Sequence, residues 1–349
     1  MNIVIVTDAW EPQVNGVVRT LTKTRDHLIE LGNTVTMLTP EGHRTIPCPS
    51  YPSIPLALFP GRKISQQLEK IRPDAIHIAT EGPLGIAARS WCLRNNVKFT
   101  TSYHTQFPEY LKLRLPIPLS WSYAWFRRFH NKAVHTLVPT ASQKKRLEKR
   151  GFTNVFVWGR GVDTDIFQPD NPQPLDLPRP ISVNMGRVSI EKNIEAYLDL
   201  DLPGSKVVIG DGPDLDSLKQ RYPDVLFTGA KFGHELASWV AAGDVFVFPS
   251  KTDTFGLVLL ESMACGVPVA AYPVTGPKDV IQQGVTGVLD NDLTVATKQA
   301  LMLNSEDCIH YAKQRNWKAC THTFLQLMHN NSTDTEKKTA ITDPSFWSL

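Results

Sequence analysis

The sequence predicts an α/β protein with two domains, each built around a doubly wound parallel sheet. Its 349 residues exceed one ordinary domain, and two domains of roughly 150 residues are the natural division. A buried strand, a loop, a helical pattern and a second strand follow one another at residues 3–38 and again at 244–271. A proline-rich passage at 169–180 is typical of a linker. We therefore expect domains at 1–168 and 181–325 and a loose tail at 326–349.

The composition excludes several classes of protein. The net charge of +3 does not by itself indicate nucleic acid, and the five cysteines lack the CxxC spacing of a zinc site. No HExxH, GxxxxGK[ST] or complete GxGxxG motif is present. The amino terminus lacks a signal-peptide pattern, and no run of about 18 apolar residues occurs. We expect a protein of the reducing cytosol that neither spans a membrane nor is exported.

The first strand–loop–helix unit begins almost at residue 1. Residues 3–7 form a β-branched run, and the loop WEPQVNGVV at 10–18 leads into a helical pattern at 17–31. Gly16 lets the backbone of this loop approach a ligand closely, although Asn15-Gly16 is equally typical of a plain turn.

The next units place a histidine at the end of a strand. Residues 40–60 are proline-rich, and we expect them to be irregular, whereas 64–71 favour a helix and 73–78 a strand. The strand at 99–103 delivers His104 to its carboxyl end, where parallel sheets bind ligands. Hydrogen bonding within the loop is the alternative role for His104.

The stretch 110–135 holds several aromatic residues among basic ones. Rings beside cations suit the headgroup level of a membrane, whereas core packing explains the aromatics equally well. A second basic stretch, SQKKRLEKRG at 142–151, is by default a solvated helix face. No nucleic-acid motif is present. The candidate membrane or acceptor surface comprises Trp121, Trp125, Arg127, Arg128, Lys144 and Lys145.

The second domain opens with a strand at 181–185 that runs into GRVSIEKN, which carries Arg187 and Lys192. The planar fork of an arginine and the mobile charge of a lysine suit a diphosphate, although such residues are often only solvated. A strand at 206–209 then leads to Gly210 and the turn GDGP, and residues 225–228 lead to Lys231.

The stretch PSKTDTFGLVLLESMACGVPV at 249–269 is the most informative part of the chain. A buried strand at 244–248 precedes it, and its apolar positions favour a helix from Leu257 onwards. Asp253 precedes this helix and Glu261 follows it by eight residues, so that Glu261 lies about two turns down the helix. Gly256 lets the backbone approach closely, and amides at a helix start favour an anion.

In this order the motifs resemble the retaining GT-B glycosyltransferases of the large family 4 group, which use a nucleotide-sugar donor. The resemblance covers residues 1–325 and rests on the loop at Gly16, YHTQFPEY around His104, GR-x4-K, GDGP and the acidic-x7-acidic pair Asp253/Glu261. It implies two facing Rossmann-like domains with the donor in the cleft between them.

The resemblance also implies roles for single residues. Arg187 and Lys192 would neutralise the leaving nucleoside diphosphate, and Glu261 would hold the ribose hydroxyls. Asp253 would bind hydroxyls of the transferred sugar, where the family more often has glutamate, and His104 would line the reacting face of the sugar. The remaining expected donor contacts are Gly16, Gly210, Lys231, Phe255, Gly256 and Leu257. No metal and no cofactor is expected.

These observations predict a metal-independent transferase that moves a hexose or uronic acid from a UDP- or GDP-sugar to a membrane lipid such as diacylglycerol. We expect it to dock peripherally on the inner face of the cell membrane. Two alternatives stay open: a mannosyl- or glucosyltransferase with a soluble or polysaccharide acceptor, and a non-catalytic subunit that binds nucleotide sugars.

Overall fold

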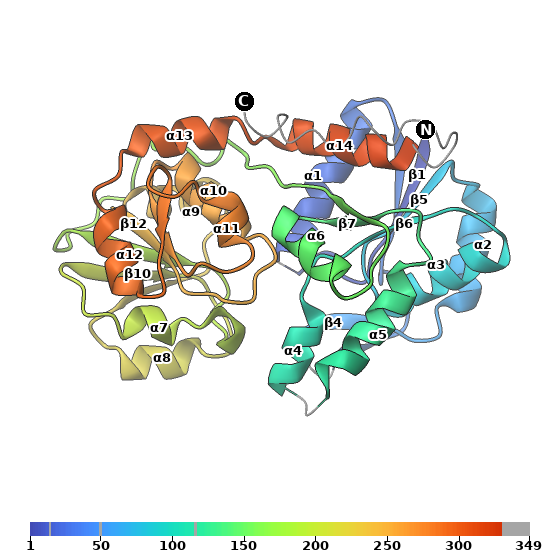
Figure 1. Cartoon of the computed structure of the whole chain (residues 1–349), viewed down its shortest axis with the longest axis horizontal. Coiled ribbons are helices and arrows are strands. Elements are labelled where there is room, and N and C mark those ends of the chain that lie inside the picture. Colours follow the sequence, from blue (N-terminus) through green and yellow to red (C-terminus); the bar gives the residue numbers. More distant parts are fainter. Residues whose placement is uncertain (14, 49–50, 115–116, 330–349) are drawn as a thin grey trace. The chain divides into compact units, whose positions relative to one another are not determined.

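The computed structural model describes residues 1–13, 15–48, 51–114 and 117–329, which form two compact units (Figure 1). Within the described residues, the first unit comprises 1–139, 144–159 and Trp317–His329, and the second comprises Thr140–Gln143 and Arg160–Asn316. The chain thus enters the second unit ahead of the proline-rich passage, earlier than the expected boundary at 168. Helix α14 (Trp317–His329) belongs to the first unit. It includes the start of the expected tail, whose remainder lies outside the described residues.

The first unit holds a six-stranded parallel sheet in the order β2-β1-β5-β6-β7-β8. Because β2 and β5 flank β1, the strand order reverses between β1 and β5. The strands are β1 (Asn2–Val6), β2 (Thr34–Leu38), β5 (Ala75–Ile78), β6 (Thr100–Ser102), β7 (Thr136–Val138) and β8 (Val155–Val157). Such a switch point opens a crevice at the carboxyl ends of the strands.

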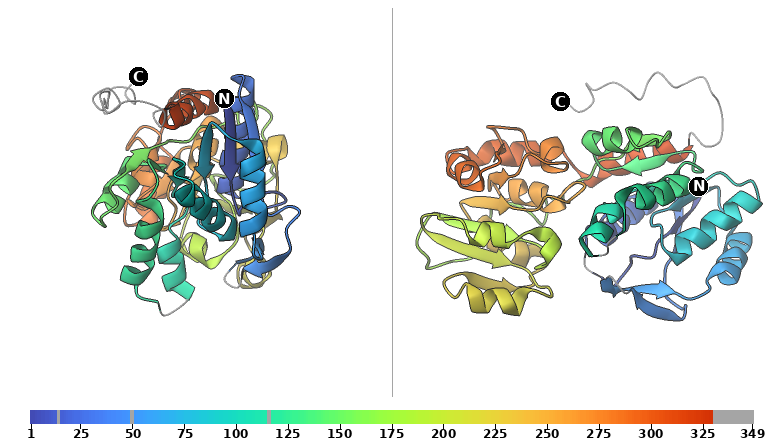
Figure 2. Two further views of the ribbon diagram at one scale, coloured as in Figure 1. Left: turned by 90° about the vertical axis from the view of Figure 1, so that its right-hand side faces the viewer. Right: turned by 60° about the horizontal axis from the view of Figure 1, so that its bottom comes forward.

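Helices cover both faces of this sheet (Figures 1 and 2). The apolar side chains of β1 and β5 alternate, so that Val4 and Ile76 pack with α2 and α3 on one face. The helices are α1 (Gly16–Glu30), α2 (Gly61–Ile71), α3 (Pro83–Arg94), α4 (Phe107–Arg114), α5 (Leu119–His130), α6 (Ala141–Glu148) and α14. No helix in the described ranges is long and apolar enough to cross a membrane.

The stretch at 40–60 is more regular than expected. Strands β3 (Thr45–Cys48) and β4 (Tyr51–Ala57) pair antiparallel as a separate two-stranded sheet. A two-stranded ribbon has open edges on both sides, where prolines are tolerated because a missing amide breaks no ladder bond.

The second unit is a six-stranded parallel sheet in the order β11-β10-β9-β12-β13-β14. Numbered within the unit, this is 3-2-1-4-5-6, the strand order of dinucleotide-binding folds, with its switch point between β9 and β12. The strands are β9 (Ile181–Met185), β10 (Ser205–Ile209), β11 (Leu226–Gly229), β12 (Val245–Phe248), β13 (Val269–Ala271) and β14 (Gly287–Leu289).

Two apolar cores lie on the two faces of this second sheet. Along β12, Phe246 packs on one face with α9 and α10, whereas Val245 and Val247 pack on the other with α7 and α12. The segments that cover the sheet are the 3-10 turn η1 (Ile190–Lys192) and the helices α7 (Glu195–Leu198), α8 (Leu215–Arg221), α9 (Gly233–Ala241), α10 (Leu257–Ala264), α11 (Pro277–Val280), α12 (Leu293–Ala300) and α13 (Ser305–Lys313). The expectation of doubly wound sheets is confirmed in both units.

Candidate functional site

A row of glycines lines the carboxyl edge of β9, β10 and β11 in the second unit. The Gly186 amide donates to the Ile209 carbonyl at 3.0 Å, and the Gly210 amide donates to the Gly229 carbonyl at 3.0 Å. A Cβ atom at Gly210 would lie 1.8 Å from the Gly186 carbonyl oxygen, whereas Cβ atoms at Gly186 and Gly229 would meet open space. Gly210, one of the expected donor contacts, thus packs against the GR loop.

Replacing Gly210 with alanine should therefore weaken folding of the second unit. A methyl group cannot fit against the Gly186 carbonyl, so the two loops must separate, and we expect a loss of about 1–3 kcal/mol in the free energy of unfolding. Urea denaturation would measure this. Gly61→Ala is the control, because a Cβ atom there meets nothing within 4 Å. Equal stabilities of the two variants would contradict this account of GDGP.

Hydrogen bonds join the loop after β9 to the loop after β12, across the switch point. The Asn193 side-chain amide donates to the Pro249 carbonyl at 3.0 Å, and the Thr252 hydroxyl donates to the Glu191 carbonyl at 3.1 Å. Asn193 adopts the left-handed conformation, with φ of 55°, that ends the η1 turn. The loop that carries Arg187 and Lys192 and the loop that carries Asp253 are therefore held together as one surface.

Lys192 and Asp253 meet directly on this surface. The Lys192 ammonium donates to the Asp253 carboxylate at 2.6 Å, and both side chains are mostly buried. Arg187 lies on the same loop as Lys192 and is half-buried. A cation pair at the carboxyl edge of a parallel sheet, with one acid holding the lysine, has the chemistry of a diphosphate site.

Helix α10 begins at this surface. Its N-cap residue, Gly256, has φ of 83° and has no side chain that could cap the first amides. A Cβ atom at Gly276 would lie 3.0 Å from the Asp253 carbonyl oxygen and 3.1 Å from that of Phe255, so Gly276 lets the neighbouring loop support this turn. Uncapped amides at the positive end of a helix favour an anion.

The other expected donor residues of the second unit differ in accessibility. Glu261 lies on α10 and is only 4% exposed, whereas Phe255 is buried in the apolar core and Leu257 packs against it. Lys231 is paired with Glu235 at 2.6 Å. Phe255 and Leu257 can therefore contact a donor through their backbone rather than through their side chains. The charge of Lys231 is balanced by Glu235.

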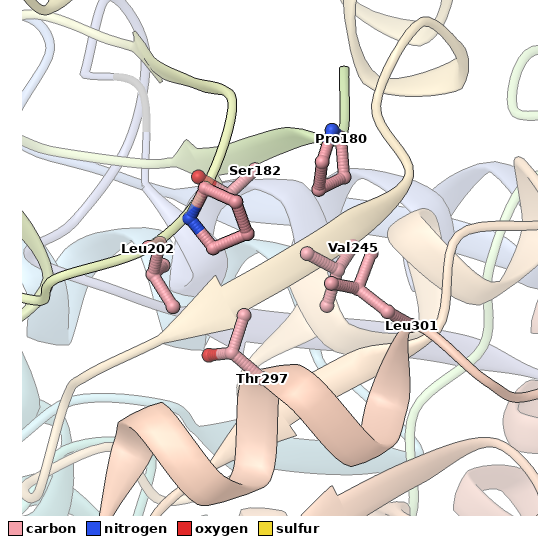
Figure 3. A pocket seen from close by; sticks show the side chains of 7 residues that line it. Pro180, Ser182, Leu202, Val245, Thr297 and Leu301 are labelled. Carbon is pink, nitrogen blue, oxygen red and sulfur yellow. The ribbon is translucent and has the colours of Figure 1, made fainter.

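A small hollow lies at the opposite end of the same sheet (Figure 3). Its lining includes Pro180 just before β9, Ser182 in β9, Val245 at the start of β12 and Leu301 after α12, and its volume is about 10 Å³. Ligand pockets usually have roughly 300 Å³ or more. This hollow is too small for a nucleotide and lies away from the glycine row, so it is a packing defect of the core.

In the first unit, a buried carboxylate that the sequence did not single out organises the switch point. Asp8 follows β1 and accepts hydrogen bonds from the Leu84 amide at 2.9 Å and the Thr80 hydroxyl at 2.8 Å. Burial raises the pKa of Asp8, and these bonds oppose part of the rise. A Cβ atom at Gly82 would lie 2.4 Å from the Asp8 carboxyl carbon. Asp8 thus caps α3, which explains the glycine that precedes this helix.

A second buried acid lies beside it. The His130 Nε2 atom lies 3.0 Å from a Glu81 carboxylate oxygen, and the other ring nitrogen lies 2.9 Å from the Thr101 hydroxyl. His130 is fully buried and Glu81 nearly so. These polar groups join the loop after β5 to the end of α5 and to β6.

His104 lies where the sequence predicts it, after β6 at the carboxyl edge of the first sheet. Its half-buried ring meets Trp158 edge to face, with 5.9 Å between ring centres. Trp158 is fully buried and donates its indole N–H to the Cys320 carbonyl at 3.2 Å. The packed indole fixes one side of the imidazole.

Gly16 is the first residue of α1 and belongs to the first unit. The Asn15 side-chain oxygen accepts from the Val17 and Val18 amides, each at 3.0 Å. Because Asn15 already caps this helix, the Val17 and Val18 amides are less available to a phosphate.

Helix α5 divides its aromatic residues between two faces. Tyr123, Phe126 and Phe129 are buried, whereas Trp121 is 73% and Trp125 46% exposed. The two tryptophans are four residues apart and therefore lie on one face, as side chains one turn apart do. Core packing thus accounts for Tyr123, Phe126 and Phe129, whereas Trp121 and Trp125 are left on the surface.

The basic residues of the expected surface are exposed to different degrees. Arg127 and Arg128 are exposed on α5, and Arg127 donates to the Arg150 carbonyl at 3.0 Å. Lys144 lies 3.9 Å from Glu148, whereas Lys145 is exposed. We call Trp121, Trp125, Arg127 and Arg128 the α5 face.

Comparisons with known proteins identify the class. Residues 14–166 match the family model "Glycosyltransferase Family 4", and residues 190–303 match "Glycosyl transferases group 1". A GDP-mannose-dependent alpha-mannosyltransferase of Mycobacterium tuberculosis is 31% identical over 317 residues, which cover 83% of each chain. The chain belongs to the family 4 glycosyltransferases.

Two further relatives carry lipid-related or sugar-specific names. Sulfoquinovosyl transferase SQD2 of Arabidopsis thaliana is 35% identical over 277 residues, which cover 72% of this chain and 53% of that protein. The chain thus spans about half the length of this relative. An alpha-monoglucosyldiacylglycerol synthase of Streptococcus pneumoniae is 28% identical over 376 aligned positions, covering 94% of this chain and 85% of the synthase.

Solved structures agree on the architecture. Sucrose-phosphate synthase of Thermosynechococcus elongatus superposes with a TM-score of 0.71 at 21% identity, covering 94% of this chain and 98% of that chain. Anabaena HepE in complex with UDP-glucose gives 0.72 at 15% identity, covering 95% and 100%. The expected GT-B fold is confirmed.

Proposed function

We propose that this chain is a retaining glycosyltransferase that moves a hexose or uronic acid from a UDP- or GDP-sugar to a diacylglycerol-type lipid. The observation that carries the proposal is the pairing of a diphosphate-type surface in one unit with the exposed aromatic and basic α5 face in the other. The relative named for diacylglycerol and the solved neighbour that holds UDP-glucose support it.

In this proposal, the chain's own residues supply the charge stabilisation. Arg187 and Lys192 neutralise the departing nucleoside diphosphate together with the first amides of α10, in place of a metal ion. Glu261 holds the ribose hydroxyls. Asp253 orients Lys192 through their contact and binds a hydroxyl of the transferred sugar, while His104 lines the reacting face of that sugar.

A product assay tests the proposal. The chain is incubated with UDP- and GDP-linked hexoses and uronic acids, with and without diacylglycerol vesicles, in the presence of EDTA. We expect a glycolipid whose anomeric configuration equals that of the donor. A mannosylated soluble product made without lipid would instead favour the second candidate, a mannosyltransferase, which the name of the mycobacterial relative supports. Donor binding without any product would indicate a non-catalytic subunit.

The α5 face is proposed to dock on anionic lipid at the inner face of the cell membrane. Indole rings favour the headgroup level, and each cation near such a surface contributes about 1 kcal/mol, screened within roughly 8–10 Å at ordinary salt. Trp121 and Trp125 provide the rings, and Arg127 and Arg128 provide charge on the same helix. Lys145, exposed on α6, adds to the charge of this unit.

Removing both indoles should weaken vesicle binding. We expect Trp121→Ala with Trp125→Ala to lower sedimentation with anionic vesicles by roughly tenfold, since both rings lose their interfacial contact. Phe59→Ala is a matched control, because Phe59 is 95% exposed in the same unit but lies outside α5. Binding that survives the double substitution, or that is equal on neutral vesicles and insensitive to salt, would refute docking through this face.

A further inference from the structure

The segment that follows His104 has little local structure to hold it. β6 ends at Ser102, and α4 begins only at Phe107. Within the segment, the Phe107 amide donates to the Thr105 carbonyl at 2.8 Å, and the Tyr110 amide donates to the Gln106 carbonyl at 3.1 Å. These bonds, and that from the Glu109 amide to the Gln106 carbonyl at 3.0 Å, stay within the segment and the first turn of α4, so contacts with other elements are needed to fix where the segment lies.

The main partner is Arg146 on α6. One guanidinium nitrogen donates to the Gln106 side-chain oxygen at 2.7 Å, and another forms an ion pair with Glu109. Gln106 is almost fully buried, and both charged side chains are largely covered. The planar fork therefore holds two residues three positions apart at the first turn of α4.

Glu109 is held from a second side as well. The Tyr123 hydroxyl donates to the same Glu109 oxygen at 2.7 Å. Burial raises the pKa of Tyr123 to about 12, and the bond to Glu109 adds to the rise, so the hydroxyl stays a donor. The Arg150 guanidinium carbon lies 3.7 Å from the centre of the Tyr123 ring. Glu109 of α4 thus contacts side chains of both α5 and α6.

We propose that Arg146 is a positioning residue for the transfer reaction: its fork on Gln106 and Glu109 fixes the segment that carries His104. The sequence places Arg146 in a basic stretch whose default role is a solvated or lipid-facing charge, but the structure directs its guanidinium inward to this segment. The inference rests on the proposed function for the role of His104, while the clamp itself rests on the contacts alone.

The decisive variant is Arg146→Lys, which keeps the charge and loses the planar fork. A single ammonium cannot hold both Gln106 and Glu109 in the observed geometry. We expect amide hydrogen exchange in residues 104–110 to rise by roughly tenfold, with exchange in the β-strands of the first unit unchanged. Tyr123→Phe removes one bond to Glu109 and should give a smaller rise in the same residues.

The matched control is Lys149→Ala, which removes an exposed cation close to the end of the same helix. Its exchange at 104–110 should equal that of the wild type. Unchanged exchange in Arg146→Lys, or an equal rise in Lys149→Ala, would overturn the clamp. A thermal unfolding midpoint measured for each variant separates a local effect from loss of the fold.

Kinetics then test whether the clamp serves the reaction. For Arg146→Lys we expect kcat, and with it kcat/KM for the acceptor, to fall by roughly tenfold while the KM for the donor is unchanged, because His104 is proposed to act at the reacting face of the sugar whereas the nucleotide contacts are proposed on the second unit. Unchanged kcat/KM with faster exchange would overturn the positioning role. If the wild-type chain transfers no sugar to lipid, the proposed function fails, and the exchange experiment, which needs no acceptor, still decides the clamp.

Discussion

Alanine at Arg187 or Lys192 is expected to lower turnover between tenfold and roughly a hundredfold. Charge-assisted hydrogen bonds are worth about 1.5–3 kcal/mol each, and about 1.4 kcal/mol corresponds to a factor of ten in rate. Both cations lie on the loop after β9, at the switch point where a diphosphate would lose its sugar. Lys192→Ala should be the more damaging variant, because it also leaves Asp253 without the partner 2.6 Å away.

The measurement is initial-rate kinetics at limiting donor, with kcat and donor KM reported separately. Arg221→Ala is the matched control, because this arginine of the same unit forms an exposed ion pair with Glu195 outside the candidate site. Wild-type rates in Arg187→Ala and Lys192→Ala would remove the diphosphate assignment. A defect of equal size in Arg221→Ala would mean that net charge, not position, governs the rate.

The sheets and most helices follow from local pattern. The helix expected at 17–31 is α1 (Gly16–Glu30), and the strand expected at 181–185 is β9 (Ile181–Met185). Buried parallel strands appear as short apolar runs, so period and turn residues suffice to find them. The β3–β4 hairpin was missed because its prolines remove the strand signal, although an open ribbon tolerates them.

The residues of the candidate site likewise fall into those that local sequence identifies and those that depend on distant partners. Arg187, Lys192, Asp253 and Glu261 belong to local motifs and could be named from sequence. Asp8 could not be found from its neighbours, because its partners Thr80 and Leu84 lie more than 70 positions away. The signal that was present is Gly82, because a Cβ atom at this position would lie 2.4 Å from the Asp8 carboxyl carbon.

Partners far away in the sequence also decide whether a cation of α6 is exposed or forms an ion pair. The pattern SQKKRLEKRG assigns one role to all of its cations, yet Arg146 is paired inward with Glu109 whereas Lys145 is exposed. Composition cannot separate these cases, because the partner is on another helix. For the aromatic residues of α5, by contrast, the helical period does separate exposed from buried side chains. Trp121 and Trp125 share the exposed face, whereas Phe126 is buried on the other.

The two acids should fail in different ways when neutralised. Glu261→Gln is expected to raise the donor KM by roughly tenfold with a smaller change in kcat, because a ribose contact is made equally in the bound and transition states. Asp253→Asn is expected to lower kcat by roughly tenfold or more, because the amide holds Lys192 less strongly and binds the moving sugar less well. Asp216→Asn, an exposed acid of the same unit on α8, is the control.

Asp253→Glu tests the shorter side chain directly. The family more often has glutamate here, whereas in this chain the shorter Asp253 reaches the Lys192 ammonium at 2.6 Å. If the contact with Lys192 governs the rate, a glutamate displaces the ammonium and kcat falls by severalfold; if reach to the sugar governs it, kcat is kept or rises.

The outcome that would contradict separate roles for the two acids is an identical change in kcat and donor KM for Glu261→Gln and Asp253→Asn. It would show that one acid does not serve the nucleotide and the other the sugar.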